Sequence, residues 1–233
     1  MTINNRSTGA ISDAYPNLFA PAGFTFSIWG LIYLLLAAFM VYQSVPHSKA
    51  VLLKNETLLN KLNLLFIATS LANISWIFAW HYDYIGVSVL IMAVLLVLLI
   101  KIADVLRDAK MTSQEKWLVA TPFSVYFGWI TVAAIANITV FLVSIGWNGF
   151  GIPESVWTCI ILLVGALIAI LRIRKDKNIA YGLVLIWAYF GIAIKHLSTA
   201  GFDGMYPSVI GTVIVCEALF VFFSTRIFLD TNK

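Results

Sequence analysis

Residues 63–82 read NLLFIATSLANISWIFAWHY, and this stretch decides the fold class. A run of about 20 apolar residues spans the hydrocarbon core of a bilayer as one helix. The helical repeat places four of its side chains on one face: Thr69, Asn73, Trp76 and Trp80. An Asn amide that faced lipid would lack hydrogen-bond partners, so this face should look into protein or a ligand cavity. The alternative is that Asn73 only joins two helices and that the Trp rings lie at headgroup level.

The whole chain shares this apolar character. Of its 233 residues, 61% are hydrophobic and 11% are charged, and the mean hydropathy is +0.92. Soluble domains carry about 25% charged residues, so we predict an integral membrane protein. Its two cysteines, Cys159 and Cys216, lie within apolar runs without metal-ligand spacing, and we interpret them as buried small hydrophobic residues.

Apolar windows of about 19 residues occur seven times along the chain. We therefore predict an all-α polytopic membrane protein, a bundle of seven transmembrane helices. The predicted spans are 24–43, 62–82, 85–105, 118–145, 155–171, 179–197 and 206–228. Prolines and glycines mark several of their ends, among them Pro46, Gly146, Pro153 and Pro207.

The basic residues are divided unequally between the two sides of this bundle. One side would hold residues 1–23 and the loops near residues 83, 150 and 201, and its Lys and Arg residues are Arg6 and Lys195. The other side would hold the remaining basic residues: Lys49, Lys54, Lys61, Lys101, Arg107, Lys110, Lys116, Arg172, Arg174, Lys175, Lys177, Arg226 and Lys233. By the positive-inside rule, we predict the N-terminus outside and the C-terminus in the cytoplasm.

Three of the predicted helices carry aromatic and amide side chains on one face. The candidate ligand-binding residues are Trp29, Tyr33, Asn73, Trp76, Trp80, Tyr126, Trp129 and Asn137. The predicted topology places most of them in the outer half of the membrane. Aromatic walls with a few amide groups suit a flat, largely apolar ligand. Tight helix packing with an outer aromatic belt is the alternative.

Three segments resemble the tryptophan-rich sensory protein family, which includes TspO, the translocator protein and the peripheral benzodiazepine receptor. They are FTFSIWGLIY at 24–33, LANISWIFAW at 71–80, and Trp129 followed eight residues later by Asn137. The resemblance covers about residues 16–145. It implies a four-helix TspO-like core at 24–145 and three additional transmembrane helices at 146–233. Residues 1–23 are polar, and from the topology we expect them to form an external N-terminal arm.

The same resemblance implies a ligand-binding or sensory function. The ligand would be a tetrapyrrole such as haem or protoporphyrin, or a sterol-like lipid, in an outer-half pocket between the first, second and fourth helices. The residues that carry over from the family are Trp29, Tyr33, Asn73, Trp76, Trp129 and Asn137. The sequence departs from the family in two places: the Pro- and Trp-rich loop is reduced to NLFAPAG at 17–23, and the family's first helix has no counterpart.

Other polar residues allow different functions. Glu217 lies near the centre of the last predicted helix, where an unpaired carboxylate is costly. It supports a small ion-coupled transporter or permease with Glu217 as the coupling site, unless Glu217 is protonated and bonded to a neighbouring helix. His81 and His196 fall on the outer side, with Asp83 and Asp203 in adjacent loops. Such groups can hold a metal or haem iron, but they lack motif spacing, so we interpret them as interfacial side chains and expect no metal site.

Several classes of protein do not fit the sequence. It contains no nucleophile–base arrangement, phosphate-binding glycine loop or metal motif, so we expect no enzymatic activity. A retinal photoreceptor needs a Lys within its last helix, and residues 206–228 contain none. We expect membrane lipid and a small apolar ligand as partners, no nucleic acid, and a multi-pass location in a bacterial cytoplasmic membrane; a homodimer stays open.

Overall fold

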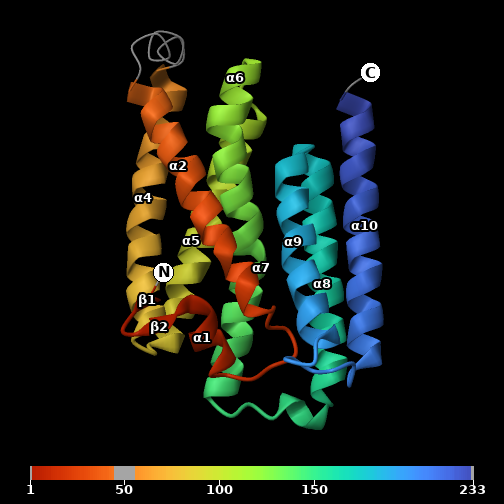
Figure 1. Ribbon diagram of the computed structural model, residues 1–233. Helices are drawn as coiled ribbons and strands as arrows, with labels where there is room; N and C mark the ends of the chain where they lie inside the picture. Colours follow the sequence, from red (N-terminus) through yellow and green to blue (C-terminus); the bar gives the residue numbers. More distant parts are fainter. Residues whose placement is uncertain (1, 45–55, 232–233) are drawn as a thin grey trace.

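The computed structural model describes residues 2–44 and 56–231, and long helices run side by side through it (Figure 1). Seven helices in these ranges are long and apolar enough to cross a membrane: Gly23–Ser44, Leu58–His81, Ile85–Arg107, Ser113–Ser144, Glu154–Asp176, Ile179–Leu197 and Pro207–Asp230. The predicted all-α polytopic bundle is therefore confirmed. The predicted stop at Pro46 and the basic residues Lys49, Lys54 and Lys233 lie outside the described residues.

The spanning helices are joined by short connections. The main helices are α2 (Ile28–Ser44), α4 (Glu56–His81), α5 (Ile85–Arg107), α7 (Thr121–Ser144), α8 (Glu154–Asp176), α9 (Ile179–Leu197) and α10 (Pro207–Thr231). The short elements are β1 (Thr2–Ile3), β2 (Arg6–Ser7), α1 (Thr8–Asp13), η1 (Gly23–Ser27), α6 (Ser113–Glu115), η3 (Lys116–Ala120) and η4 (Gly149–Gly151). Strands β1 and β2 form a two-stranded antiparallel pair.

Local sequence signals set several helix ends. Thr112 and Glu115 form a capping box, in which each side chain accepts a hydrogen bond from the other residue's backbone N–H. From there, α6, the π-helical turn η3 and α7 form one span of 32 residues. Pro122, which has no backbone N–H, lies directly after the π-helical turn. Asn178 caps α9, because its side chain accepts a hydrogen bond from Tyr181 N at 3.1 Å.

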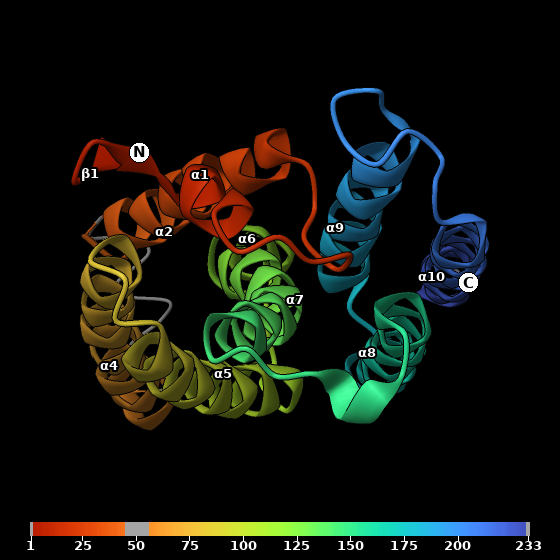
Figure 2. The ribbon, with the colours of Figure 1, turned by 90° about the horizontal axis from the view of Figure 1, so that it is seen from below.

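Helix α7 lies inside the bundle. It packs against α2, α5 and α9, while α10 packs on the outside against α8 and α9 (Figure 2). Gly128 permits the close approach of α7 and α9, because a Cβ built there would lie 2.9 Å from Val184 Cβ and 3.0 Å from Tyr181 O. Small residues at such a crossing bring the helix backbones together, as is common in membrane bundles.

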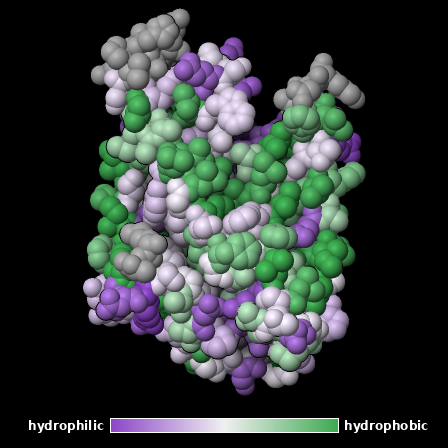
Figure 3. All heavy atoms as spheres, viewed as in Figure 1, coloured by the Kyte–Doolittle hydropathy of each residue, from purple (hydrophilic) through white to green (hydrophobic). Residues whose placement is uncertain are grey.

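The outer surface has the pattern of a membrane protein. Apolar side chains cover the middle of the molecule, and hydrophilic residues gather toward its two ends (Figure 3). Leu34, Leu64 and Leu90 are each about two-thirds exposed, which suits contact with lipid tails. At the end that holds the N-terminal segment, both predicted outer cations are paired: Arg6 with Asp83, and Lys195 with Asp13. The direction in which the bundle crosses its membrane stays a prediction.

Candidate functional site

Five aromatic rings from three helices meet at one level of the bundle, near the end covered by the N-terminal segment. Trp29 is the central ring. Its centroid lies 5.6 Å from that of Tyr33 and 5.5 Å from that of Trp76, and both pairs are stacked. Edge contacts at 6.0 and 6.4 Å join it to Tyr126 and Trp129 of α7. The stripes that periodicity places on α2, α4 and α7 therefore face one another.

Trp80 extends this cluster toward the end of the bundle. Its ring stacks on Trp76 at 5.7 Å, and its Nε1 donates a hydrogen bond to Thr8 O at 3.2 Å. Phe26 also joins the cluster, because its ring makes an edge-to-face contact with Trp129 at a centroid distance of 5.7 Å. Offset and edge-to-face contacts of this kind add to the stability that burial of the rings provides.

The two predicted amide residues hold this aromatic cluster in place. Asn137 Oδ1 accepts a hydrogen bond from Trp76 Nε1 at 3.1 Å, and its Nδ2 donates to Ser88 Oγ of α5 at 2.9 Å. Asn73 Nδ2 donates to the Tyr33 hydroxyl at 3.1 Å. Polar bonds therefore join α4 to α7, α7 to α5 and α4 to α2 inside the membrane, as the helix-joining interpretation of these residues expects.

A cavity of about 530 Å³ opens beside the aromatic cluster, between the N-terminal segment, the start of α2 and the end of α4. It is lined by Ser7, Thr8, Gly9, Gly23, Phe26, Ser27, Trp29, Gly30, Tyr33, Trp76 and Ile77. Its walls are thus mainly aromatic and apolar, with three hydroxyl groups from Ser and Thr. Its size lies within the range of about 300–1,000 Å³ that is usual for small-molecule sites.

Not every predicted site residue reaches this cavity. Trp29, Tyr33 and Trp76 line it, whereas the other five are packed behind or beside these rings: Asn73, Trp80, Tyr126, Trp129 and Asn137. Three buried polar atoms in this second group lack a hydrogen-bond partner within the described ranges: Asn73 Oδ1, the Tyr126 hydroxyl and Trp129 Nε1. Unpaired polar atoms are costly in a dry interior, so these three atoms lower the stability of the packing behind the cavity.

The comparisons with known proteins identify the family of the chain. The family model described as TSPO-like protein matches residues 1–226. The chain belongs to the TSPO-like protein family. The match extends beyond residues 16–145, to which the sequence resemblance was confined, and includes α8, α9 and most of α10. Comparisons with curated proteins and with solved structures gave no match.

The N-terminal segment closes this end of the TSPO-like bundle. Asn4 Nδ2 donates to His81 O at 3.2 Å, Arg6 pairs with Asp83, and the Tyr15 hydroxyl donates to Asp83 Oδ1 at 3.4 Å. Burial and the nearby Asp83 carboxylate raise the pKa of the Tyr15 hydroxyl above its ordinary value, which favours the protonated form that donates this bond. These contacts hold residues 7–9 against the cavity.

Further along, the segment reaches the second half of the bundle. Leu18 N donates to Glu154 Oε1 of α8 at 2.9 Å, and the Leu18 carbonyl lies 2.8 Å from His196 Nε2 of α9. Ala22 N donates to Gly191 O at 2.9 Å. Residues 4–22, which we call the N-terminal strap, thus join α4, α8 and α9 across the end that carries the aromatic cluster.

His81 and His196 lie beneath this strap and are fully buried, so the expectation of interfacial side chains was wrong for both. His81 Nδ1 bonds Ile77 O at 2.9 Å, which makes Nδ1 the protonated nitrogen. Leu18 O of the N-terminal segment bonds the His196 ring, and Asn4 bonds the His81 backbone carbonyl. Contacts of this kind with a distant segment leave no pattern in the sequence. In the described ranges, no group of three or more His, Cys, Asp or Glu side chains is arranged to hold a metal ion.

Glu217 lies on α10, away from the aromatic cavity. It is partly buried, and its Oε1 has no hydrogen-bond partner within the described part of the chain. The neighbouring Cys216 is fully buried, as predicted, with Sγ 3.9 Å from Leu162 O. Cys159 is only partly buried.

Sequence reasoning missed several residues that build the site. Ser88 had a usable signal, because it is an isolated polar residue in the apolar start of its span. Thr8 and Gly9 had none, since they reach the cavity through the course of the N-terminal segment. Gly30 and Ile77 line the cavity next to predicted residues, but periodicity alone does not separate them from lipid-facing positions.

Proposed function

We propose that this TSPO-like protein is a membrane receptor or sensor that binds a flat, largely apolar ligand in the cavity beside Trp29 and Trp76. The ligand would be a tetrapyrrole, such as haem or protoporphyrin, or a sterol-like lipid. One observation carries the proposal: stacked indole rings wall a cavity of about 530 Å³, large enough for a ligand of this class. A flat ring system placed there would continue the stack of Trp29, Trp76 and Trp80.

The polar groups near the cavity support an orienting role. Ser7, Thr8 and Ser27 contribute hydroxyl groups to the lining, and Tyr33 contributes its phenol. Such groups can bind the carboxylates of a tetrapyrrole or the hydroxyl of a sterol. The described lining residues include no nucleophile paired with a general base, so we propose binding rather than catalysis.

The location of the cavity supports uptake from the outer side. It lies at the end where Arg6 and Lys195 are paired with carboxylates, opposite the end that holds most of the basic residues. Under the positive-inside rule, this end would face the extracytoplasmic side, and we propose a bacterial cytoplasmic membrane as its location. Residues 7–9, the part of the N-terminal segment that lines the cavity, would then separate the ligand from the aqueous phase.

Gly30 allows a direct test. It lines the cavity, and a Cβ built on it meets no heavy atom within 4 Å. Gly30→Leu therefore places a side chain in the cavity without a backbone clash. Gly211→Leu is the matched control, because Gly211 also lies in a spanning helix with open space around it, far from the cavity on α10. Both changes remove a helical glycine and stabilise the helix by a similar amount, about 1 kcal/mol or less.

The assay is a titration of intrinsic Trp fluorescence in nanodiscs, with protoporphyrin IX and the sterol dehydroergosterol as separate probes. We expect saturable quenching by one of the two in wild-type protein and in Gly211→Leu, and at least about tenfold weaker binding, near 1.4 kcal/mol, in Gly30→Leu. Equal affinity in all three proteins would exclude this cavity as the site. Absence of saturable quenching by both probes would refute the ligand class.

Glu217 supports one alternative function, a small ion-coupled transporter. The supporting observation is its partly buried carboxyl group within a spanning helix, with Oε1 unpaired in the described ranges. Proton-coupled uptake into liposomes should then be lost in Glu217→Gln and retained in Glu217→Asp. Equal flux in wild type and Glu217→Gln would remove this alternative.

A further inference from the structure

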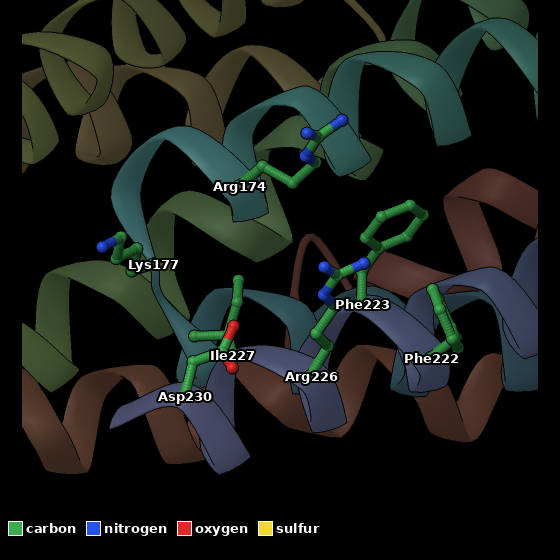
Figure 4. A pocket seen from close by; sticks show the side chains of 7 residues that line it. All are labelled: Arg174, Lys177, Phe222, Phe223, Arg226, Ile227 and Asp230. Atoms are coloured by element: carbon green, nitrogen blue, oxygen red, sulfur yellow. The ribbon is translucent and has the colours of Figure 1, made fainter. Parts of the chain in front are cut away.

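A second groove, of about 700 Å³, lies at the opposite end of the bundle from the aromatic cavity, between the ends of α8 and α10 (Figure 4). Arg174 and Lys177 line it from α8 and the residue that follows, and Arg226 lines it from α10. Phe222 and Phe223 form its apolar part on α10. The groove thus combines three cations with an aromatic wall.

The cations of this groove are not neutralised by the protein. Within the described ranges, no carboxylate oxygen lies within 4.0 Å of the charged nitrogens of Arg174, Lys177 or Arg226, and Asp230 is the single acidic residue of the lining. The guanidinium of Arg174 instead lies over the Phe223 ring, 5.9 Å from its centroid. The groove therefore has a net charge of +2 from three cations and one carboxylate.

Two neighbouring arginines at the same end, Arg107 and Arg172, are paired with carboxylates. Arg172 pairs with Asp176 at 2.6 Å and with Asp104 at 2.8 Å, and Arg107 bonds both of these carboxylates. Those charges close an ion-pair network between α5 and α8. The arginines of the groove between α8 and α10 therefore differ from Arg107 and Arg172, because no carboxylate of the described residues pairs with them.

We propose that this groove binds the headgroup of an anionic phospholipid, with its phosphate between the cations of α8 and α10 and its acyl chains beside Phe222. Guanidinium groups bind phosphate oxygens in pairs, and two arginines from different helices present such groups here. Phe222 is 56% exposed and continues the lipid-facing surface of α10, so the apolar part of a lipid has a surface to follow. A soluble phosphate has no group that would use this wall, which favours the lipid.

The test measures binding of phosphatidylglycerol and phosphatidylcholine with matched acyl chains to the full-length protein by native mass spectrometry. The test variant is Arg174→Gln/Arg226→Gln. Its control is Lys101→Gln/Lys110→Gln, which removes two exposed positive charges from the same end but on the α5 side. A second variant, Arg174→Lys/Arg226→Lys, keeps both charges and controls for folding. Each cation near anionic lipid contributes about fivefold in affinity, so two contribute about 25-fold.

We expect wild-type protein to prefer phosphatidylglycerol, and the Gln double variant of the groove to lose about 25-fold of that preference. The Lys101/Lys110 control should keep most of it. The Lys double variant, which keeps the charges but loses the paired guanidinium donors, should lie between wild type and the Gln double variant. An equal loss in the control would assign the effect to net charge and overturn the site. Inorganic phosphate or glycerol 3-phosphate at millimolar concentration should not displace the lipid. Displacement by either would show a site for a soluble anion and would overturn the assignment to lipid.

Discussion

Asn137 gives the sharpest test of how the aromatic cluster is held. It is 2% exposed and makes two hydrogen bonds to other helices, one from Trp76 Nε1 and one to Ser88 Oγ. Ser88 Oγ also lies 3.3 Å from Asn137 Oδ1, but its single proton is used in the shorter bond of 2.7 Å to Ile85 O. Asn137→Ala therefore breaks two interhelical bonds and leaves the Trp76 N–H buried without a partner.

The expected loss follows from these two bonds. Interhelical side-chain hydrogen bonds in membranes contribute about 0.6 kcal/mol each on average and up to about 1.7 kcal/mol. Two of them predict that Asn137→Ala lowers the free energy of unfolding by about 1 to 3 kcal/mol. Ser88→Ala, which removes one of the two interhelical bonds, should lower it by about half as much. Unfolding in mixed micelles of dodecyl sulfate and a mild detergent measures both.

A double-mutant cycle isolates the bond to the indole. Trp76→Phe removes the donor, so Asn137→Ala and Trp76→Phe together should cost at least about 0.5 kcal/mol less than the sum of the single changes. Additivity to within about 0.3 kcal/mol would mean that the two groups do not interact, and it would refute the account of how Trp76 is oriented.

Two further predictions concern stability at the two ends of the bundle. Gly191→Ala places a Cβ 2.0 Å from Thr25 Oγ1, so it should lower the free energy of unfolding by about 1 to 3 kcal/mol. The double variant Gly191→Ala/Thr25→Ala should recover part of this loss. An unchanged free energy of unfolding in Gly191→Ala would contradict the close approach of the two residues. Asp176→Asn leaves the largely buried Arg172 paired with Asp104 alone. It should lower the free energy of unfolding by about 3 kcal/mol, the lower end of the range for a broken buried ion pair. A melting temperature equal to that of wild type would contradict burial of the pair.

The sequence was sufficient to predict the spanning helices, because a bilayer imposes both their length and their apolar composition. It also predicted which faces of α2, α4 and α7 carry the aromatic cluster, since the helical repeat leaves little freedom once a span is known. Trp29, Trp76 and Asn137 meet as that repeat requires. What periodicity could not provide is which rings pack against one another and which border an open space.

The N-terminal segment shows why the rest could not be predicted. Backbone groups of this segment make its contacts with Trp80, His196 and Gly191. The two residues of each contact are separated by 72 to 178 positions in the chain. Backbone groups are the same in every residue, so such contacts leave no mark on composition or spacing. Because this segment forms part of the cavity lining, the position of the cavity could be determined only from the structure.

The central claim is that a flat, apolar ligand binds beside the stacked indoles. The measurement that tests it most directly is a structure of the full-length protein in nanodiscs, determined with whichever of the two probes saturates in the fluorescence titration. We predict ring density in the cavity between residues 7–9, α2 and α4, in contact with Trp29 and Trp76. Ring density on the lipid-facing surface or elsewhere in the bundle, with this cavity empty, would contradict the account.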